Sequence, residues 1–189
     1  MIASRPMRIL VVVASASGRT TRLAEAVAAG AAEAGAEVTL RRARDAGDQE
    51  FLDADAVILG SGVQMGGIAA ELRALFERLA PLWLAGRLVG KLGAAFVTAG
   101  AGARGGAELA LVSIHAFLAE QGMLLVPMPN RLAGFRAGGS HWGPVAWTNP
   151  RGGVAGPTPE HLEAARAHGR FVAECTARWL AGASASAGA

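Results

Sequence analysis

The stretch that decides the fold is Ile9-Leu10-Val11-Val12-Val13-Ala14-Ser15-Ala16-Ser17-Gly18-Arg19-Thr20-Thr21. Its apolar first half predicts a buried strand, and the spacing of the apolar residues Leu23, Ala24, Val27 and Ala28 predicts a helix directly after it. Between the two lies a loop of small hydroxyl residues with one glycine. This order aims backbone N–H groups and hydroxyls at one point beside a helix N-terminus, which is typical of a phosphate or other anion site.

The composition of the loop restricts the phosphate that it suits. The loop contains no Lys-Ser or Lys-Thr pair after a Gly-x-x-x-x-Gly pattern, so a triphosphate P-loop is excluded. A hydroxyl-rich loop with a single glycine suits a terminal phosphomonoester, such as that of flavin mononucleotide (FMN). The competing interpretation is a capped helix start, in which the Ser and Thr side chains only satisfy backbone donors.

The bulk properties predict one globular domain. The chain has 189 residues, of which 52% are hydrophobic and 17% charged, and we expect a domain over residues 7–180 with a disordered tail at 181–189. We find no stretch long enough to span a bilayer and no signal-peptide pattern, and the single cysteine, Cys175, cannot form an internal disulfide. A cytoplasmic location is therefore expected. The net charge of +3 and the small Arg41–Arg44 cluster indicate no nucleic-acid partner.

Strand and helix patterns alternate along the chain. Strands are predicted at 7–14, 37–41, 56–60, 92–98 and 123–126, and helices at 20–34, around 68–79, at 107–121 and from Thr158-Pro159 to Leu180. Such alternation predicts a parallel sheet covered on both faces. We expect a flavodoxin-like three-layer α/β/α fold with a five-stranded parallel sheet in the order 2-1-3-4-5. Its ligand would lie at the carboxyl ends of the first and third strands.

Three glycine-rich loops follow neighbouring strands of this predicted sheet, at 15–20, 61–67 and 99–106. Small residues let backbone amides approach a planar ligand, so the three loops together predict a flavin site with phosphate in the first loop and the ring between the others. The third loop also matches Gly100-x-Gly102-x-x-Gly105, a dinucleotide fingerprint. No acidic residue follows at the required spacing, so we interpret these glycines as allowing close backbone approach.

Several aromatic and histidine residues are candidates for contacts with substrate. Trp83 either flanks a ring or is an ordinary core or interface tryptophan. His141 lies in Ser140-His141-Trp142-Gly143, within a segment at 128–158 that we expect to lack regular elements, and it is either a proton donor or a surface histidine. His115, His161 and His168 lie on predicted helices without metal-ligand spacing and are interpreted as structural, so no metal site is expected.

From Met7 to Leu180 the chain resembles the WrbA-type flavoproteins, which are flavodoxin-like NAD(P)H:quinone oxidoreductases. The resemblance rests on the Ser15–Thr20 loop, on Leu-Trp-x-x-Gly-x-x-x-Gly-Lys at 82–91, on Thr98-x-Gly100-x-Gly102, on Gln121-Gly122-Met123 and on Gly138-Gly139-Ser140-His141-Trp142-Gly143. The chain departs from the family pattern in its ring loop, Gly62-Val63-Gln64-Met65-Gly66. It also has Gln121 and Trp142 in place of a histidine and a tyrosine.

The resemblance implies a set of roles for particular residues. It implies that the FMN phosphate is held by Ser15, Ala16, Ser17, Gly18, Arg19 and Thr20, and that the ring is surrounded by Gly62, Val63, Gln64, Met65, Ala99, Gly100, Ala101, Gly102 and Gln121. Trp83 and Trp142 would wall the substrate space, with Trp142 often supplied by a neighbouring subunit, and His141 would donate a proton or hydrogen bond. The family is commonly tetrameric, which implies a homo-oligomer.

The sequence therefore predicts an FMN-dependent oxidoreductase that transfers hydride from NAD(P)H to a quinone or a similar small two-electron acceptor. Two alternatives remain at this point. An electron-transfer flavodoxin is typically acidic and shields its flavin with aromatic residues that often include tyrosine, whereas this chain is slightly basic and has none. The other alternative is a flavin-free binding or scaffold protein of the same fold.

Overall fold

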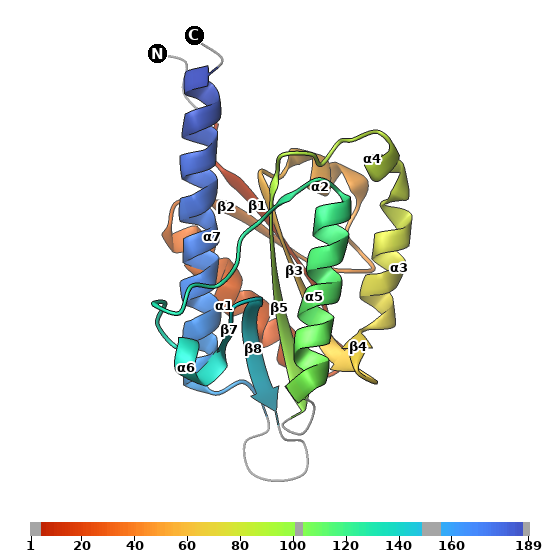
Figure 1. The fold of residues 1–189 in the computed structure, drawn as a ribbon, viewed down its shortest axis with the longest axis vertical. Coiled ribbons are helices and arrows are strands. Elements are labelled where there is room, and N and C mark those ends of the chain that lie inside the picture. Colours follow the sequence, from red (N-terminus) through yellow and green to blue (C-terminus); the bar gives the residue numbers. More distant parts are fainter. Residues whose placement is uncertain (1–4, 101–103, 149–155, 187–189) are drawn as a thin grey trace.

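The computed structural model describes residues 5–100, 104–148 and 156–186 (Figure 1). Its elements, in chain order, are β1 (Arg8–Ala14), α1 (Arg19–Glu33), β2 (Glu37–Arg42), α2 (Asp48–Asp53), β3 (Ala56–Gln64), β4 (Gly67–Ile68), α3 (Ala70–Arg78), α4 (Ala80–Leu84), β5 (Leu92–Gly100), α5 (Arg104–Glu120), β6 (Leu124–Leu125), α6 (Phe135–Gly138), β7 (Gly139–Ser140), β8 (Gly143–Thr148) and α7 (Pro159–Ser186). Among the described helices, none is long and apolar enough to cross a bilayer.

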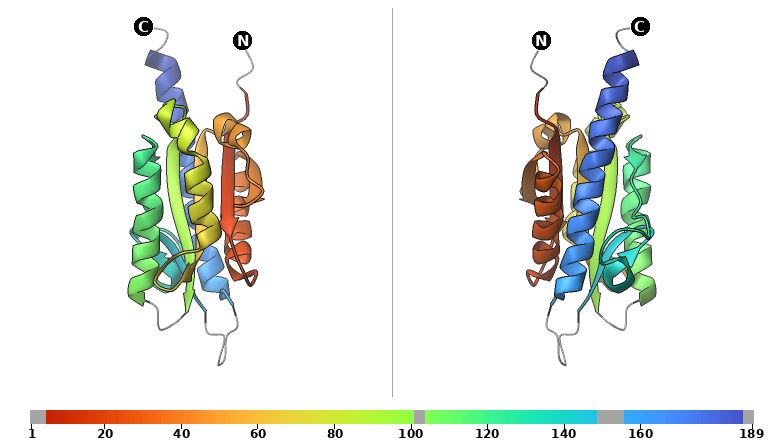
Figure 2. Two further views of the ribbon diagram at one scale, coloured as in Figure 1. Left: turned by 90° about the vertical axis from the view of Figure 1, so that its right-hand side faces the viewer. Right: turned by 90° about the vertical axis from the view of Figure 1, so that its left-hand side faces the viewer.

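A parallel sheet in the order β2-β1-β3-β5-β8 forms the middle layer. Alternate residues of its buried strands point to opposite faces. Val11, Ile58 and Phe96 pack against α1 and α7, whereas Val12, Leu59 and Val97 pack against α3 and α5. Figure 2 shows the two helix layers on opposite sides of the sheet. The predicted flavodoxin-like α/β/α architecture is confirmed.

The fifth position of the sheet is built differently from the prediction. The predicted strand at 123–126 is only the two-residue β6, which pairs with Leu92 and Gly93 at the start of β5. The carboxyl half of β5 pairs instead with β8, from Val97↔Val145 to Gly100↔Thr148. Pro127 and Pro129 cannot donate to a strand ladder, so the chain leaves the sheet and returns as β8. The expectation that residues 128–158 lack regular elements is wrong where they are described, because α6, β7 and β8 lie there.

The helices also differ from the prediction after β2 and at the end of α7. A short helix, α2, occupies the connection that follows β2; its start is capped by Glu50, which accepts a hydrogen bond from the Gly47 N–H at 3.1 Å, and it buries Phe51. At the other end of the chain, α7 continues to Ser186 and so includes residues 181–186 of the expected disordered tail. Alanine has the highest helix propensity, and extending a helix that already exists needs no new nucleation.

Candidate functional site

The loop after β1 leaves the start of α1 without a side-chain cap. Gly18 occupies the cap position with φ at 79° and has no side chain that could cap the helix, and the first turn of α1 contains no acidic residue. The first N–H groups of a helix have no partner within the helix and carry its positive partial charge. The structure therefore lacks the Ser or Thr cap of the competing interpretation, and it presents an uncapped helix start at the carboxyl end of β1.

Hydroxyl groups from two neighbouring elements gather beside this helix start. The Ser15 Oγ atom is buried and has no hydrogen-bond partner among the described residues. Thr20 Oγ1 lies 2.7 Å from Thr98 Oγ1, which links α1 to the end of β5. A Cβ atom added at Gly62 would lie 3.3 Å from Thr20 Oγ1. An unpaired buried hydroxyl costs about 1–3 kcal/mol, so Ser15 is suited to a polar ligand such as the FMN phosphate.

The second loop is a tight hairpin rather than an irregular loop. β3 extends beyond its predicted end and pairs with β4 through Val63↔Ile68 and Gln64↔Gly67. Met65 and Gly66 form the turn with φ values of 47° and 85°, which is the left-handed backbone of a two-residue hairpin turn. The Met65 side chain is fully exposed at the tip. At the base, Ser61 Oγ accepts a hydrogen bond from the Ala69 N–H at 2.8 Å.

The third predicted ring segment follows β5. Ala99 is buried and Gly100 ends the strand; Ala101 and Gly102 lie outside the described residues. Thr148 Oγ1 donates to the Ala99 carbonyl at 3.2 Å. The uncapped start of α1, the β3–β4 hairpin and the end of β5 therefore share one rim of the sheet, at the lower end of Figure 1.

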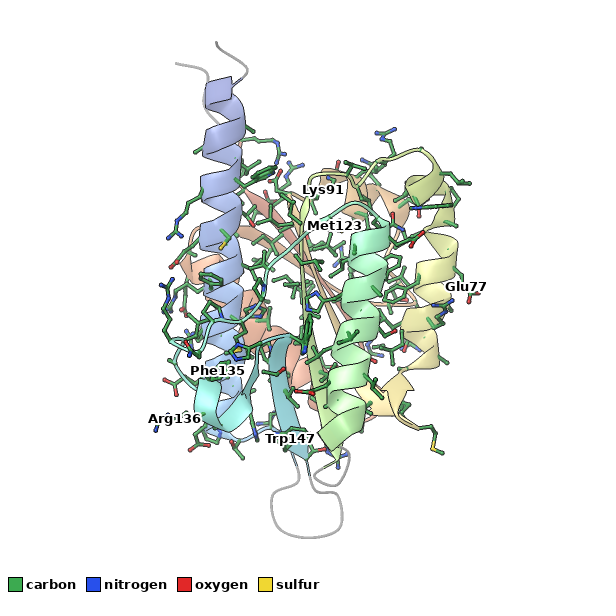
Figure 3. All side chains as sticks on the ribbon, in the orientation of Figure 1. Glu77, Lys91, Met123, Phe135, Arg136 and Trp147 are labelled. Atoms are coloured by element: carbon green, nitrogen blue, oxygen red, sulfur yellow. The ribbon has the colours of Figure 1, made fainter. Side chains whose placement is uncertain are left out.

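Three further residues belong to this rim, although the sequence pattern assigned no individual role to them: Ser61, Thr98 and Trp147. Trp147 pairs in register with Ala99 and lies near the carboxyl end of β8 (Figure 3). A hydroxyl at the end of the predicted strand at 92–98 was a usable signal for Thr98. The place of Trp147 depends on β8 pairing with β5, for which the sequence contained no signal.

Within one chain, Trp83 and Gln121 do not lie on this rim. Trp83 is in α4, and the Gly90 N–H donates to the Gly122 carbonyl at 3.0 Å, which places the turn after α5 beside the amino end of β5 (Figure 1). Both residues line a cavity of about 400 Å³ that also includes the stacked rings of Phe76 and Phe117. The physical reason is that α3 and α5 run antiparallel to the strands, so residues after these helices return to the opposite end of the sheet.

Trp142 and His141 also lie away from the rim of their own chain. They form the turn between β7 and β8, and a Cβ atom added at Gly143 would meet the carbonyl oxygen of Ala95, in the middle of β5. The side chain of Trp142 is 46% exposed. His141 is exposed and its ring lies 5.3 Å from that of Phe135.

The other three histidines, His115, His161 and His168, are buried in the fold. The Thr158 N–H donates to His161 Nδ1 at 3.1 Å at the start of α7, and burial lowers the pKa of His161. His168 is completely buried on the same helix. The described residues contain no group of three or more His, Cys, Asp or Glu side chains placed to hold a metal ion.

This chain is similar to known proteins over most of its length. The family described as NADPH-dependent FMN reductase matches residues 7–136. A protein of Brucella anthropi named NAD(P)H dehydrogenase (quinone) is 32% identical over 91% of this chain and 98% of its own length. One of Paracoccus denitrificans with the same name is 34% identical over 92% of this chain and 96% of its own.

Solved structures show the same fold. A WrbA-like flavodoxin protein from Agrobacterium tumefaciens superposes with a TM-score of 0.71 at 24% identity, covering 91% of this chain and 98% of that one. A flavodoxin from the domain Archaea superposes with a TM-score of 0.66 at 22% identity, covering 90% and 99%.

Proposed function

This chain belongs to the NADPH-dependent FMN reductase family, and from this premise we propose that it transfers hydride from NAD(P)H through bound FMN to a quinone. The family resemblance inferred from the sequence is confirmed, as are FMN as cofactor and NAD(P)H as co-substrate. The observation in the structure that carries the proposal is the buried Ser15 Oγ, which has no hydrogen-bond partner in the described parts of the chain and lies beside the uncapped start of α1. A cytoplasmic location remains a proposal.

The phosphate would be held by the residues from Ser15 to Thr20. Ser15 Oγ would donate a hydrogen bond to a phosphate oxygen, and the first N–H groups of α1 would supply further donors at the positive end of the helix dipole. The positive φ of Gly18 turns the backbone without placing a Cβ atom in the open space in front of the helix, where a Cβ atom would meet none of the described residues beyond its chain neighbours within 4 Å. Arg19 would add positive charge.

The ring would lie between the β3–β4 hairpin and the end of β5, against Gly62, Val63, Gln64 and Met65 on one side and Ala99–Gly102 on the other. Bound FMN supplies the two-electron chemistry itself. The chain orients the ring through backbone groups of the hairpin, which Ser61 fixes at its base. The exposed Met65 side chain would cover apolar ring surface and exclude water.

The substrate space would be completed by a second copy of the chain. Trp83, Gln121 and Trp142 lie away from their own rim, so they can contact a ring only if another subunit presents it. The helix α5, which ends next to Gln121, has exposed apolar side chains, Leu109 and Val112, and Gln121 Oε1 is buried without a partner among the described residues. His141 would donate a proton or hydrogen bond at this completed site.

The function is tested by the colour of the purified protein. We expect an absorbance band at about 450 nm from bound FMN, loss of that band when NADPH is added without oxygen, and its return on addition of a quinone. A protein that stays colourless even with added FMN would be a scaffold. A yellow protein that neither NADPH nor NADH bleaches would be an electron carrier.

If Ser15 binds the phosphate, replacing it should weaken FMN binding without destabilising the FMN-free protein. Ser15→Ala removes a hydroxyl for which the described residues provide no partner, so the unfolding free energy of the FMN-free protein should stay equal or rise slightly. The FMN dissociation constant should rise by roughly tenfold or more, because a hydrogen bond to a charged group is lost. Riboflavin, which lacks the phosphate, is the control ligand and should bind both proteins equally. Equal FMN affinities in titration would contradict the role.

Trp83→Ala tests the proposed substrate wall. We expect FMN affinity to remain within about twofold, and kcat/KM for the quinone to fall by roughly tenfold, because an aromatic contact with the bound substrate is lost. Sedimentation of the variant should be measured alongside, to separate loss of the wall from loss of subunit assembly. If FMN affinity and turnover fall together, Trp83 packs against the ring instead.

A further inference from the structure

A buried histidine holds the backbone of the exposed tryptophan at the β7–β8 turn. His115, on α5, is 4% exposed, and its Nε2 atom lies 2.6 Å from the carbonyl oxygen of Trp142. The two rings also approach each other, with centroids 6.0 Å apart. The residues are 27 positions apart in the chain, so this contact joins the helix layer to the turn across the edge of the sheet.

The chemistry of this contact determines the tautomer of His115. A carbonyl oxygen only accepts, so Nε2 must carry the proton and donate it. Nδ1 is then an acceptor, and it is buried without a partner among the described residues. Burial lowers the pKa of His115, against a smaller raising effect of the Trp142 hydrogen bond. The imidazole ring of His115 is therefore neutral near pH 7, and its single N–H group, on Nε2, points at the carbonyl oxygen of Trp142.

Other contacts restrict the movement of the β7–β8 turn on its remaining sides. The Trp142 N–H donates to Ser140 Oγ at 3.2 Å, and the Met128 N–H donates to the His141 carbonyl at 3.1 Å. Gly143 has no room for a side chain against Ala95. The backbone of Trp142 is thus fixed while nearly half of its side chain remains exposed, and this is the arrangement of an aromatic side chain pre-positioned for contact.

We propose that His115 is a positioning residue, which fixes the indole of Trp142 so that it can wall the acceptor space. This inference rests on the proposed function, because there Trp142 contacts the acceptor. In this role His115 acts through Trp142 and not through a contact of its own with the acceptor. Its contribution is to keep Trp142 in one orientation before the acceptor arrives, so that less ordering is needed on binding.

The position of Trp142 is measured directly by ¹⁹F NMR of protein labelled with 5-fluorotryptophan. The chain has four tryptophans, and Trp142→Phe assigns the signal of Trp142. In His115→Leu, which fills a similar volume but cannot donate, we expect the Trp142 signal to shift and broaden while the other three stay in place. His115→Gln should restore the signal, because its amide nitrogen can donate from near the position of Nε2.

Ile114→Val is the matched control, since it loosens the adjacent buried position on α5 without touching the hydrogen bond. It should leave all four signals in place. An unchanged Trp142 signal in His115→Leu would overturn the inference. Equal shifts of all four signals would also overturn it, because they would indicate a general packing role.

Steady-state kinetics separate this inference from the proposed function. In His115→Leu we expect kcat/KM for the quinone to fall by roughly tenfold, with recovery to within about twofold in His115→Gln and an unchanged FMN dissociation constant. If Trp142→Ala leaves quinone turnover unchanged, the role of Trp142 in the proposed function fails. If Trp142→Ala lowers turnover and His115→Leu does not, only the positioning role fails.

Discussion

Gly18→Val should abolish retention of FMN by the purified protein. The added side chain would enter the open space before α1, where an added Cβ meets no atom of the described residues beyond its chain neighbours within 4 Å and where we place the phosphate. It would also strain the backbone, because Gly18 has φ at 79° and β-branched residues rarely adopt this conformation. We expect the FMN dissociation constant to rise at least ~100-fold, or about 2.7 kcal/mol. Fluorescence titration of the colourless protein with FMN measures it.

The same helix provides a matched control. Gly35 follows the carboxyl end of α1 with φ at 88°, and its added Cβ atom would likewise lie more than 4 Å from every described residue except its chain neighbours. Gly35→Val therefore imposes a similar backbone strain at a place where no phosphate is proposed. It should lower the unfolding free energy as much as Gly18→Val does, yet leave FMN affinity unchanged. If both variants lose FMN equally, strain and not occupation of the phosphate site is the cause.

Acidification should destabilise the protein through His168. Its side chain is fully buried on α7. Burial lowers the pKa of His168 from 6.5 to about 4, against a smaller raising effect of the backbone at Val126 and Pro127. The unfolded chain therefore takes up the proton more readily than the folded one. The stability is fully present above pH 6.5 and is lost as the pH falls towards the folded-state pKa.

The size of this loss in unfolding free energy follows from the shift in the pKa of His168. We expect the unfolding free energy of the FMN-free protein to fall by roughly 3 kcal/mol between pH 6.5 and pH 4 because of His168 alone. Lowered pKa values of His115 and His161 add to the loss in the same direction. Urea unfolding at a series of pH values measures the sum.

His168→Met isolates the contribution of this one residue. Methionine is flexible enough to fill the buried site without a titrating group, so the decline between pH 6.5 and pH 4 should become shallower by about 3 kcal/mol in total. Measurements of both proteins at pH 8 correct for any difference in packing, because the His168 side chain is neutral there in both states. Parallel curves for the two proteins would rule out His168 as the source.

Much of the fold followed from local pattern. The run from Ile9 to Val13, the hydroxyl loop and the helix after it specify a strand, a turn and a helix within about 25 residues, and their order predicts where an anion binds. The same local reasoning placed β2, β5 and α5 to within a few residues. It failed for β8, because Val145 to Thr148 pair with a strand about 48 positions earlier.

The features of the site fall into the same two groups, those that local sequence pattern predicts and those that depend on contacts between distant segments. Sequence alone determined that a hydroxyl loop precedes a helix and that glycine-rich turns follow two further strands, since these depend on neighbours along the chain. Only the tertiary structure decided that the Ser15 hydroxyl is buried with no partner in the part of the chain that the structure describes. It also decided that Met65 is exposed at the tip of a hairpin, and that Trp83 and Trp142 lie away from the rim. The reason is physical: burial and hydrogen bonding depend on which segments meet in space, and helices that run back along a sheet carry neighbours in sequence to its opposite end.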